Sequence, residues 1–290
     1  MATKSGNRTT ARHKRSTATK STPTPSGNGS APSNRDALRK LYLSLLKSRL
    51  VQEAVQRGVR ASAYDFAIGH EAIVAGATAD LEAQDTITAR PRDLAALLAK
   101  GLPLKSLLAS DNDVERHVCG APAPASFVSL PEDPFHLGTG IALAHKLENR
   151  RRIVMAFGAP DASLPESWHT AMKFAGVHKL PVVYVISSEA ASAPGQLPHL
   201  EEISFMARDC GFPGVVVDAQ DVVAVWRVGQ ESILRARNGG GPTLIDCRTD
   251  PARDPLAHLE HYMRKRNAWD EDWKQQLTAQ ITAEIEAAAL

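Results

Sequence analysis

Long apolar runs are missing from this sequence and cysteines are few, and each shortage excludes a class of protein. The longest apolar runs, such as residues 181–186, are far shorter than the roughly 20 residues that cross a bilayer. We therefore expect no transmembrane helix and no membrane partner. The three cysteines, at positions 119, 210 and 247, are odd in number and far apart, which favours reduced thiols over a disulfide framework. Because the N-terminus also lacks an apolar secretory core, the sequence predicts a cytoplasmic protein.

Residues 1–34 contain no acidic side chain and almost no large apolar one. Their six cations are Lys4, Arg8, Arg12, Lys14, Arg15 and Lys20. Since the whole chain has a formal net charge of +2, the remaining residues carry about −4. A segment rich in Ser, Thr, Gly and Pro cannot build a core, so we predict a disordered basic tail. Binding of a nucleic acid or a targeting role are the alternatives, and nucleic acid is not the expected partner.

Helical periodicity starts after the tail. Leu38, Leu41, Tyr42, Leu45 and Leu46 recur at the spacing of a buried helical face. A second helix is expected over residues 71–81, and a third stops at Gly101, a residue type typical of helix C-caps. Residues 110–137 are rich in Pro and Ala without a clear period, and we interpret them as a connecting loop.

The second half of the chain alternates strands and helices. Four runs rich in β-branched residues, 153–157, 181–186, 215–217 and 243–247, are apolar on both faces and separated by helical patterns. This alternation predicts an α/β fold with a parallel sheet and helices on both of its faces. We expect residues 35–290 to form a single domain that ends in two helices broken near Asn267. Ligands of such sheets bind beyond the carboxyl ends of the strands, where Gly158 stands.

Several stretches resemble one family. The residues "SWHTAMKFAGVHKLPVVYVI" (167–186) carry the most specific likeness, and residues 63–108, 138–146 and 211–247 extend it over about two thirds of the chain. In this order they resemble the α subunit of the thiamine-diphosphate-dependent 2-oxo acid dehydrogenases of the pyruvate and branched-chain type, in a divergent and shortened form. The resemblance implies a thiamine-diphosphate-binding fold, a β-like subunit or a second copy as partner, and oxidative decarboxylation with acyl transfer to a lipoyl carrier.

The resemblance also implies where the cofactor would sit. In the family, Mg²⁺ and the diphosphate are held by a Gly-Asp-Gly turn after one strand and an Asn-Asn pair after the next. Here Gly158 keeps the first glycine, while Ala159 and Pro160 replace the aspartate and the second glycine. Ser188 and Glu189 stand at the Asn pair. Gly158 and Ser188 are thus the candidates for cofactor contact at these two turns.

Two further positions leave alternatives open. Asp161 could supply the missing metal ligand, or it could be a turn residue ahead of the capping-box pattern formed by Ser163 and Glu166. Arg92 matches an arginine that contacts the diphosphate in the family, or it is a solvated surface arginine. Glu71 is interpreted as structural, near a helix start, and His169 as a packing histidine. No residue of this chain is assigned as catalytic.

Loop lengths differ from the family as well. Two active-site loops of the family have no counterpart, one between Leu108 and Gly138 and the other between Cys247 and Pro255. Two hypotheses therefore compete. The chain is either an α-subunit-like component with reduced or no turnover, or a non-catalytic pseudoenzyme that serves as a structural or regulatory partner subunit.

Overall fold

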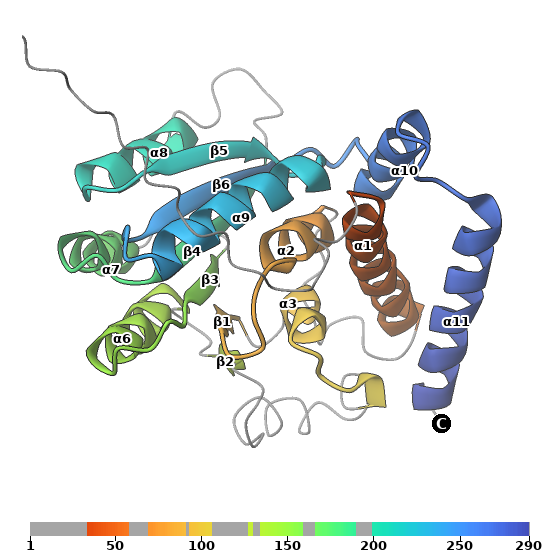
Figure 1. Cartoon of the computed structure of the whole chain (residues 1–290), viewed down its shortest axis with the longest axis horizontal. Helices are drawn as coiled ribbons and strands as arrows, with labels where there is room; N and C mark the ends of the chain where they lie inside the picture. Colours follow the sequence, from red (N-terminus) through yellow and green to blue (C-terminus); the bar gives the residue numbers. More distant parts are fainter. Residues whose placement is uncertain are drawn as a thin grey trace, which may run out of the picture. The chain divides into compact units, whose positions relative to one another are not determined.

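The core of the fold is a parallel sheet whose centre consists of apolar, buried strands (Figure 1). These are β3 (Val154–Gly158), β4 (Val182–Glu189) and β6 (Thr243–Thr249). With β1 (Thr86–Ala89), β2 (Phe127–Ser129) and β5 (Gly214–Asp218), the described strands form one six-stranded sheet in the order β2-β1-β3-β4-β6-β5. Each neighbouring pair is parallel. The predicted α/β class with a parallel sheet is confirmed.

The computed structural model describes residues 34–57, 69–90, 93–105, 127–129, 134–158, 166–189 and 199–289. They belong to one compact unit that runs from Ser33 to Leu290. The predicted disordered basic tail lies outside the described residues. No helix within the described ranges combines the length and the apolar character needed to span a bilayer.

Helices cover both faces of the sheet, as predicted, and divide the core in two. On one face lie α6 (Pro134–Leu147), α7 (Glu166–Val177) and α8 (His199–Asp209). The other face carries α2 (His70–Thr78), α3 (Leu94–Ala99) and α9 (Val222–Arg237). Alternate residues of β3 separate accordingly, because side chains of a strand point to opposite faces. Met155 and Phe157 join the core under α2 and α9, whereas Val154 and Ala156 join the core under α6 and α7.

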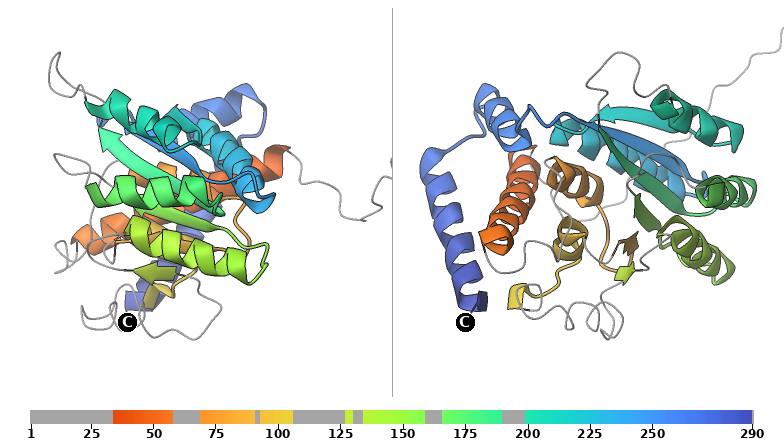
Figure 2. Two further views of the ribbon diagram at one scale, coloured as in Figure 1. Left: turned by 90° about the vertical axis from the view of Figure 1, so that its left-hand side faces the viewer. Right: turned by 180° about the vertical axis from the view of Figure 1, so that it is seen from behind.

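Three more helices form a layer beyond α2 and α3. They are α1 (Asn34–Arg57), α10 (Pro255–Lys265) and α11 (Glu271–Ala289), and α11 runs along α1 (Figure 2). The predicted buried face of the first helix is confirmed, since Leu38, Leu41, Tyr42, Leu45 and Leu46 are all buried. The break near Asn267 is also confirmed, and Asn267 itself has a φ of 53°.

Two predictions about the strands were wrong. Residues 110–137 were expected to form a loop, yet they contain β2 and the first turn of α6, in which Pro134 occupies the first helical position. Proline suits the first helical position because a backbone N–H there has no partner within the helix, so its loss costs no hydrogen bond. β5 was expected to be buried on both faces. α8 and α9 do contact it from opposite faces, but it is the edge strand among the described strands, and its cover is incomplete because Val216 is 48% exposed.

Candidate functional site

The carboxyl ends of β3, β4 and β6 meet at one edge of the sheet. At the end of β3, Gly158 pairs with Ile186 of β4. Two residues further along β4, Ser188 pairs with Arg248 of β6. Gly158 therefore lies at the end of the strand next to the one that carries Ser188, as the sequence predicts. In parallel sheets this edge is where ligands bind.

Gly158 is required by packing at the end of β3. A Cβ atom on this residue would lie 2.6 Å from Cη2 of Trp168 and 2.9 Å from Cε1 of Phe135. The two aromatic rings stack with their centroids 4.1 Å apart. Trp168 is buried, and its Nε1 has no hydrogen-bond partner among the described residues. Packing against these two rings thus explains the glycine at position 158 without any contact to a phosphate.

Ser188 donates its hydroxyl hydrogen to a buried carboxylate on the neighbouring strand. Ser188 Oγ lies 2.7 Å from Asp246 Oδ1, and the two residues are 5% and 0% exposed. The guanidinium of Arg248 approaches the other carboxylate oxygen at 3.4 Å. Burial raises the pKa of Asp246 although both neighbours favour the charged form. Thr249 completes the cluster by donating from Oγ1 to the Ser188 carbonyl at 3.2 Å.

The start of α2 packs against the same edge. A Cβ atom on Gly69 would lie 3.4 Å from Cγ2 of Thr249 and 2.9 Å from Nε2 of Gln220, and Gly69 has a φ of +95°. Only glycine adopts this conformation readily at such a close approach. Gln220 is fully buried, and its Oε1 has no hydrogen-bond partner in the part of the chain that the structure describes. The N-terminus of α2 therefore packs against the carboxyl end of β6.

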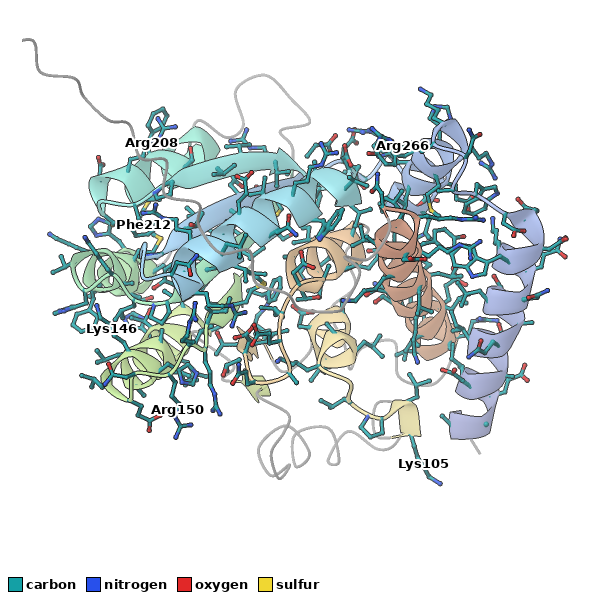
Figure 3. The ribbon with its side chains drawn as sticks, in the orientation of Figure 1. Lys105, Lys146, Arg150, Arg208, Phe212 and Arg266 are labelled. Atoms are coloured by element: carbon teal, nitrogen blue, oxygen red, sulfur yellow. The ribbon has the colours of Figure 1, made fainter. Side chains whose placement is uncertain are left out.

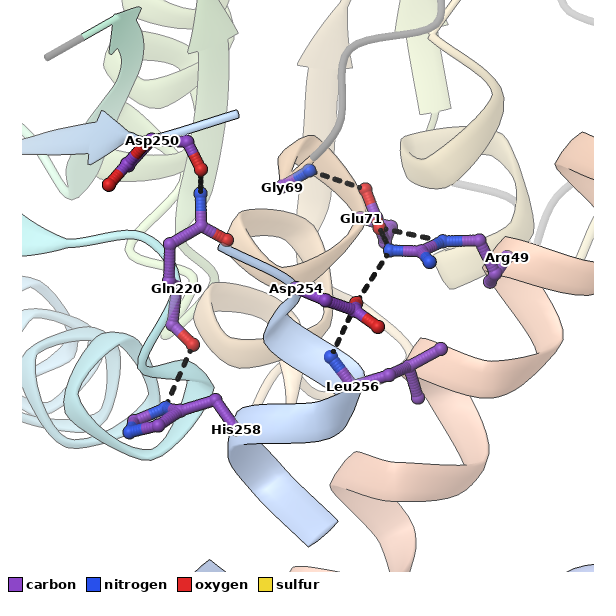
Figure 4. A network of polar contacts seen from close by, with 8 residues as sticks. All are labelled: Arg49, Gly69, Glu71, Gln220, Asp250, Asp254, Leu256 and His258. Carbon is purple, nitrogen blue, oxygen red and sulfur yellow. Dashed lines mark hydrogen bonds and ion pairs between the residues drawn. The ribbon is translucent and has the colours of Figure 1, made fainter. Parts of the chain in front are cut away.

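The carboxylate of Glu71 also holds the start of α2 in place through hydrogen bonds (Figure 4). Its Oε2 accepts from the Gly69 N–H at 3.0 Å, and its Oε1 accepts from Nε of Arg49 at 3.0 Å. Arg49 also contacts Asp254, the N-cap residue of α10, at 3.2 Å. Glu71 is 2% exposed. The prediction of a structural role near a helix start is confirmed for Glu71, and the same contacts attach α10 to α1 and α2.

The other candidate positions are only partly described. Arg92 and Asp161, together with Ala159 and Pro160, lie outside the described residues, as does the side chain of Glu189. His169 is half-buried on α7. The structure thus brings Gly158 and Ser188 to one edge of the sheet and gives no position for Arg92 or Asp161.

The described side chains do not match the donor set that a magnesium diphosphate requires. Mg²⁺ takes oxygen ligands in near-octahedral geometry, usually carboxylates together with phosphate oxygens. Among the described residues at the two turns, only Ser188 has a polar side chain. Its hydroxyl already donates a hydrogen bond to Asp246. Across the described ranges, no group of three or more His, Cys, Asp or Glu side chains is arranged to hold a metal ion.

Sequence reasoning missed the residues that hold these elements in place. The sequence alone does not predict a role for Asp246 or Arg248. The available signal is the charged Asp246 inside the apolar run 243–247, because charged residues are rarely buried. Arg49 and Asp254 are separated from Glu71 by 22 and 183 positions, and no spacing pattern connects them.

Known proteins resemble this chain over most of its length. The model of the family described as "Dehydrogenase E1 component" matches residues 40–250. The α subunit of acetoin:2,6-dichlorophenolindophenol oxidoreductase from Bacillus subtilis is 28% identical over 227 residues, which cover 72% of this chain and 68% of that protein. The pyruvate dehydrogenase E1 component subunit alpha from Staphylococcus aureus is 25% identical over 282 residues, which cover 86% of this chain and 75% of that protein.

A solved structure from Mycobacterium smegmatis, described as a thiamin diphosphate-dependent enzyme, superposes with a TM-score of 0.42 at 23% sequence identity. The match covers 62% of this chain and 31% of that one. The family model, in contrast, spans well over half of the 290 residues. This chain belongs to the family of dehydrogenase E1 components.

Proposed function

We propose that the chain is an α-subunit-like component of a thiamine-diphosphate-dependent 2-oxo acid dehydrogenase whose own metal and diphosphate half-site is incomplete. In this role it has little or no turnover and acts mainly as a structural or regulatory partner subunit. The relatives that support the first part are named as α subunits of a pyruvate dehydrogenase and of an acetoin oxidoreductase. Family membership alone does not establish turnover, because function resides in the site.

The Ser188–Asp246 hydrogen bond is the observation that supports an incomplete half-site with little or no turnover. At the position where the family has an amide carbonyl, the serine hydroxyl points its hydrogen at a buried carboxylate on β6. A hydroxyl engaged in this way is a weak replacement for the carbonyl oxygen of an asparagine at a magnesium site. The substitution of Pro160 for a glycine also removes a backbone N–H that could reach a phosphate.

The alternative is an active component in which Asp161 provides the carboxylate ligand. In that case the chain would bind thiamine diphosphate and Mg²⁺ with a β-like subunit, and Arg92, Gly158 and Ser188 would border the diphosphate. Oxidative decarboxylation and acyl transfer to a lipoyl carrier would follow as in the family. Because the described donor set does not fit the metal, we derive no catalytic step through the cofactor.

A partner subunit is supported by exposed apolar side chains on two adjoining helices. Leu147 at the end of α6 and Val177 at the end of α7 are 73% and 71% exposed, and Phe174 on α7 is also exposed. α6 and α7 pack side by side. Large apolar side chains gathered on a surface are typical of protein interfaces. A β-like subunit or a second copy is the expected partner, in a cytoplasmic assembly that involves neither membrane nor nucleic acid.

Calorimetric titration of thiamine diphosphate with Mg²⁺ tests this proposal. The full chain is titrated alone and as a complex with a β-like subunit purified by co-expression. We expect no saturable, metal-dependent heat in the micromolar range for the chain alone, and no turnover of a 2-oxo acid attributable to its half-site in the complex. Saturable binding with turnover would instead favour the active alternative.

A further inference from the structure

A small cavity lies at the amino end of β1, away from the candidate functional site. Thr86 at the start of β1 pairs with Val154 at the start of β3, whereas Gly158 ends β3, so the cavity and the candidate site occupy opposite ends of the sheet. The cavity has a volume of about 280 Å³, close to the lower limit of roughly 300 Å³ for small-molecule sites. Its size therefore suits a ligand of few atoms. Its walls include Leu81, Glu82, Ala83, Ile87, Ala99 and Lys100.

Part of this cavity is apolar. Leu81, Ala83, Ile87 and Ala99 contribute only hydrocarbon side chains to it. Ile87 belongs to the core under α2 and α9, and Leu81 packs against the same core. Since burial of an aliphatic group against such side chains is favourable, the cavity can hold a short hydrocarbon chain.

The ammonium group of Lys100 supplies the positive charge of the cavity. Its Nζ donates to the backbone carbonyl of Asp85, which uses one of its three N–H donors. The carboxylate of Asp85 pairs instead with Arg237 at 2.7 Å, and nowhere in the described segments does half-buried Lys100 form an ion pair. Burial lowers the pKa of Lys100, and the charge of Asp85 opposes this change only in part. The ammonium thus has free donors and no carboxylate partner of its own.

The carboxylate of Glu82 supplies the negative charge. Its Oε2 accepts from Nε2 of Gln84 at 2.6 Å, and its Oε1 lies 3.3 Å from Nη1 of Arg237. Arg237 is bound more closely to both carboxylate oxygens of Asp85, at 2.7 and 3.2 Å. Glu82 therefore keeps acceptor capacity for a further donor.

Lys100 and Glu82 line the same cavity but form no ion pair with each other in the stretches that the structure describes. Each is tethered to a different neighbour, Lys100 to the Asp85 carbonyl and Glu82 to Gln84. An anionic ligand would be repelled by Glu82, and an amine would be repelled by Lys100. A ligand that carries both a carboxylate and an ammonium group meets each charge with its opposite.

We propose that this cavity binds a small α-amino acid with an aliphatic side chain. The carboxylate of the ligand pairs with Lys100, its ammonium group pairs with Glu82, and its side chain packs against Leu81 and Ile87. The site requires no metal and shares no residue with the candidate functional site. It therefore goes beyond the proposed function and exists whether or not thiamine diphosphate binds.

Calorimetric titration of L-leucine into the full chain, without Mg²⁺ or thiamine diphosphate, tests this proposal. Two compounds with related skeletons are titrated for comparison: isocaproate lacks the ammonium group, and isoamylamine lacks the carboxylate. We expect saturable binding of L-leucine, with isocaproate binding about threefold and isoamylamine about tenfold more weakly. Absence of saturable heat with L-leucine, or equal affinity for isocaproate, would overturn the proposal.

Three variants and a matched control locate the bound amino acid. Lys100→Met keeps the apolar stem without the charge and should weaken L-leucine binding about tenfold or more. Glu82→Gln, at an exposed position, should abolish the preference for L-leucine over isocaproate, and Ala99→Phe, also exposed, should block the cavity while leaving both charges in place. Lys105→Met, exposed and outside the cavity lining, should leave the affinity unchanged. Unchanged L-leucine binding by folded Lys100→Met or Ala99→Phe would refute the assignment of this cavity.

Discussion

The Ser188 hydroxyl on β4 and the Asp246 carboxylate on β6 form a buried hydrogen bond of 2.7 Å near the carboxyl ends of the two strands. The two residues come together because β4 and β6 are parallel neighbours, with Ser188 opposite Arg248 and Asp246 opposite Ile186. The contact satisfies a carboxylate that would otherwise be costly to bury. It also engages the side chain that the sequence resemblance proposes as a cofactor contact.

Replacing Ser188 by alanine should destabilise the protein by about 1 to 3 kcal/mol, because the buried Asp246 loses its closest donor. The free energy of unfolding in urea, followed by circular dichroism, measures this change. Ser187→Ala is the matched control, since the half-buried Ser187 points to the opposite face of β4 and should alter stability by less than about 0.5 kcal/mol. Equal effects of the two substitutions would contradict the role of the Ser188–Asp246 contact.

Glu71→Ala should cost more, about 2 to 4 kcal/mol of unfolding free energy. The substitution leaves the Gly69 N–H without its acceptor and the partly buried Arg49 without its main counter-ion. Since Arg49 also holds Asp254, amide exchange at the start of α10 should become faster. Glu53→Ala, on an exposed position of α1, serves as control. A loss below about 1 kcal/mol would show that this network does not stabilise the fold.

Two glycines in neighbouring helices should respond oppositely to alanine. A Cβ atom on Gly176 would lie 2.0 Å from the carbonyl oxygen of Cys210, beside Phe212, which lies between α7 and α8 (Figure 3). Gly140 on α6 has open space around the same position. We expect Gly176→Ala to lower the melting temperature through overpacking, and Gly140→Ala to raise stability by about 0.5 to 1 kcal/mol. Destabilisation by Gly140→Ala would indicate that its surface is covered in the assembled protein.

The ion pair between His70, at the start of α2, and Asp93, the N-cap residue of α3, should make stability depend on pH. Burial lowers the pKa of His70, but the Asp93 carboxylate raises it by more, so its contribution is complete below the unfolded value of 6.5 and is lost as pH rises through the folded pKa. Burial raises the pKa of Asp93, but His70 and the Ala96 N–H lower it by more, so its contribution is complete above 3.8 and is lost as pH falls through the folded pKa. The difference in unfolding free energy between the native chain and His70→Gln should therefore be largest near pH 5.5, at about 1 to 3 kcal/mol, and shrink by pH 9. A difference that grows toward pH 9 would refute the assigned ionisation.

The sequence reveals the strands at the centre of the sheet better than those at its edges. β3, β4 and β6 are recognisable because burial on both faces demands continuous apolar runs. β1 (TITA) and β2 (FVS) are too short for a periodic signal, and their pairing with β3 and with each other depends on residues far away in the chain. β5 reads like a central strand, because Val215, Val216 and Val217 do not reveal which face stays exposed.

The candidate site shows a similar division. Position along the chain was enough to locate Gly158 and Ser188 at adjoining strand ends, since βαβ units bring successive carboxyl ends to one edge. The partner of Ser188 could not be foreseen, because Asp246 is 58 residues away and the contact depends on the register between β4 and β6. Likewise the pairing of His70 with Asp93 depends on how the starts of α2 and α3 face each other.

Whether this chain has an incomplete cofactor half-site is tested most directly by calorimetric titration of thiamine diphosphate with Mg²⁺ into its complex with a β-like subunit. The same titration is made with a complex whose chain carries Ala159→Asp and Pro160→Gly. The double substitution returns the carboxylate and the backbone N–H that the family resemblance places at this turn. We expect no saturable, metal-dependent heat from the native complex and a gain of binding in the variant complex. Micromolar, Mg²⁺-dependent binding by the native complex would contradict the proposal and favour Asp161 as a working ligand.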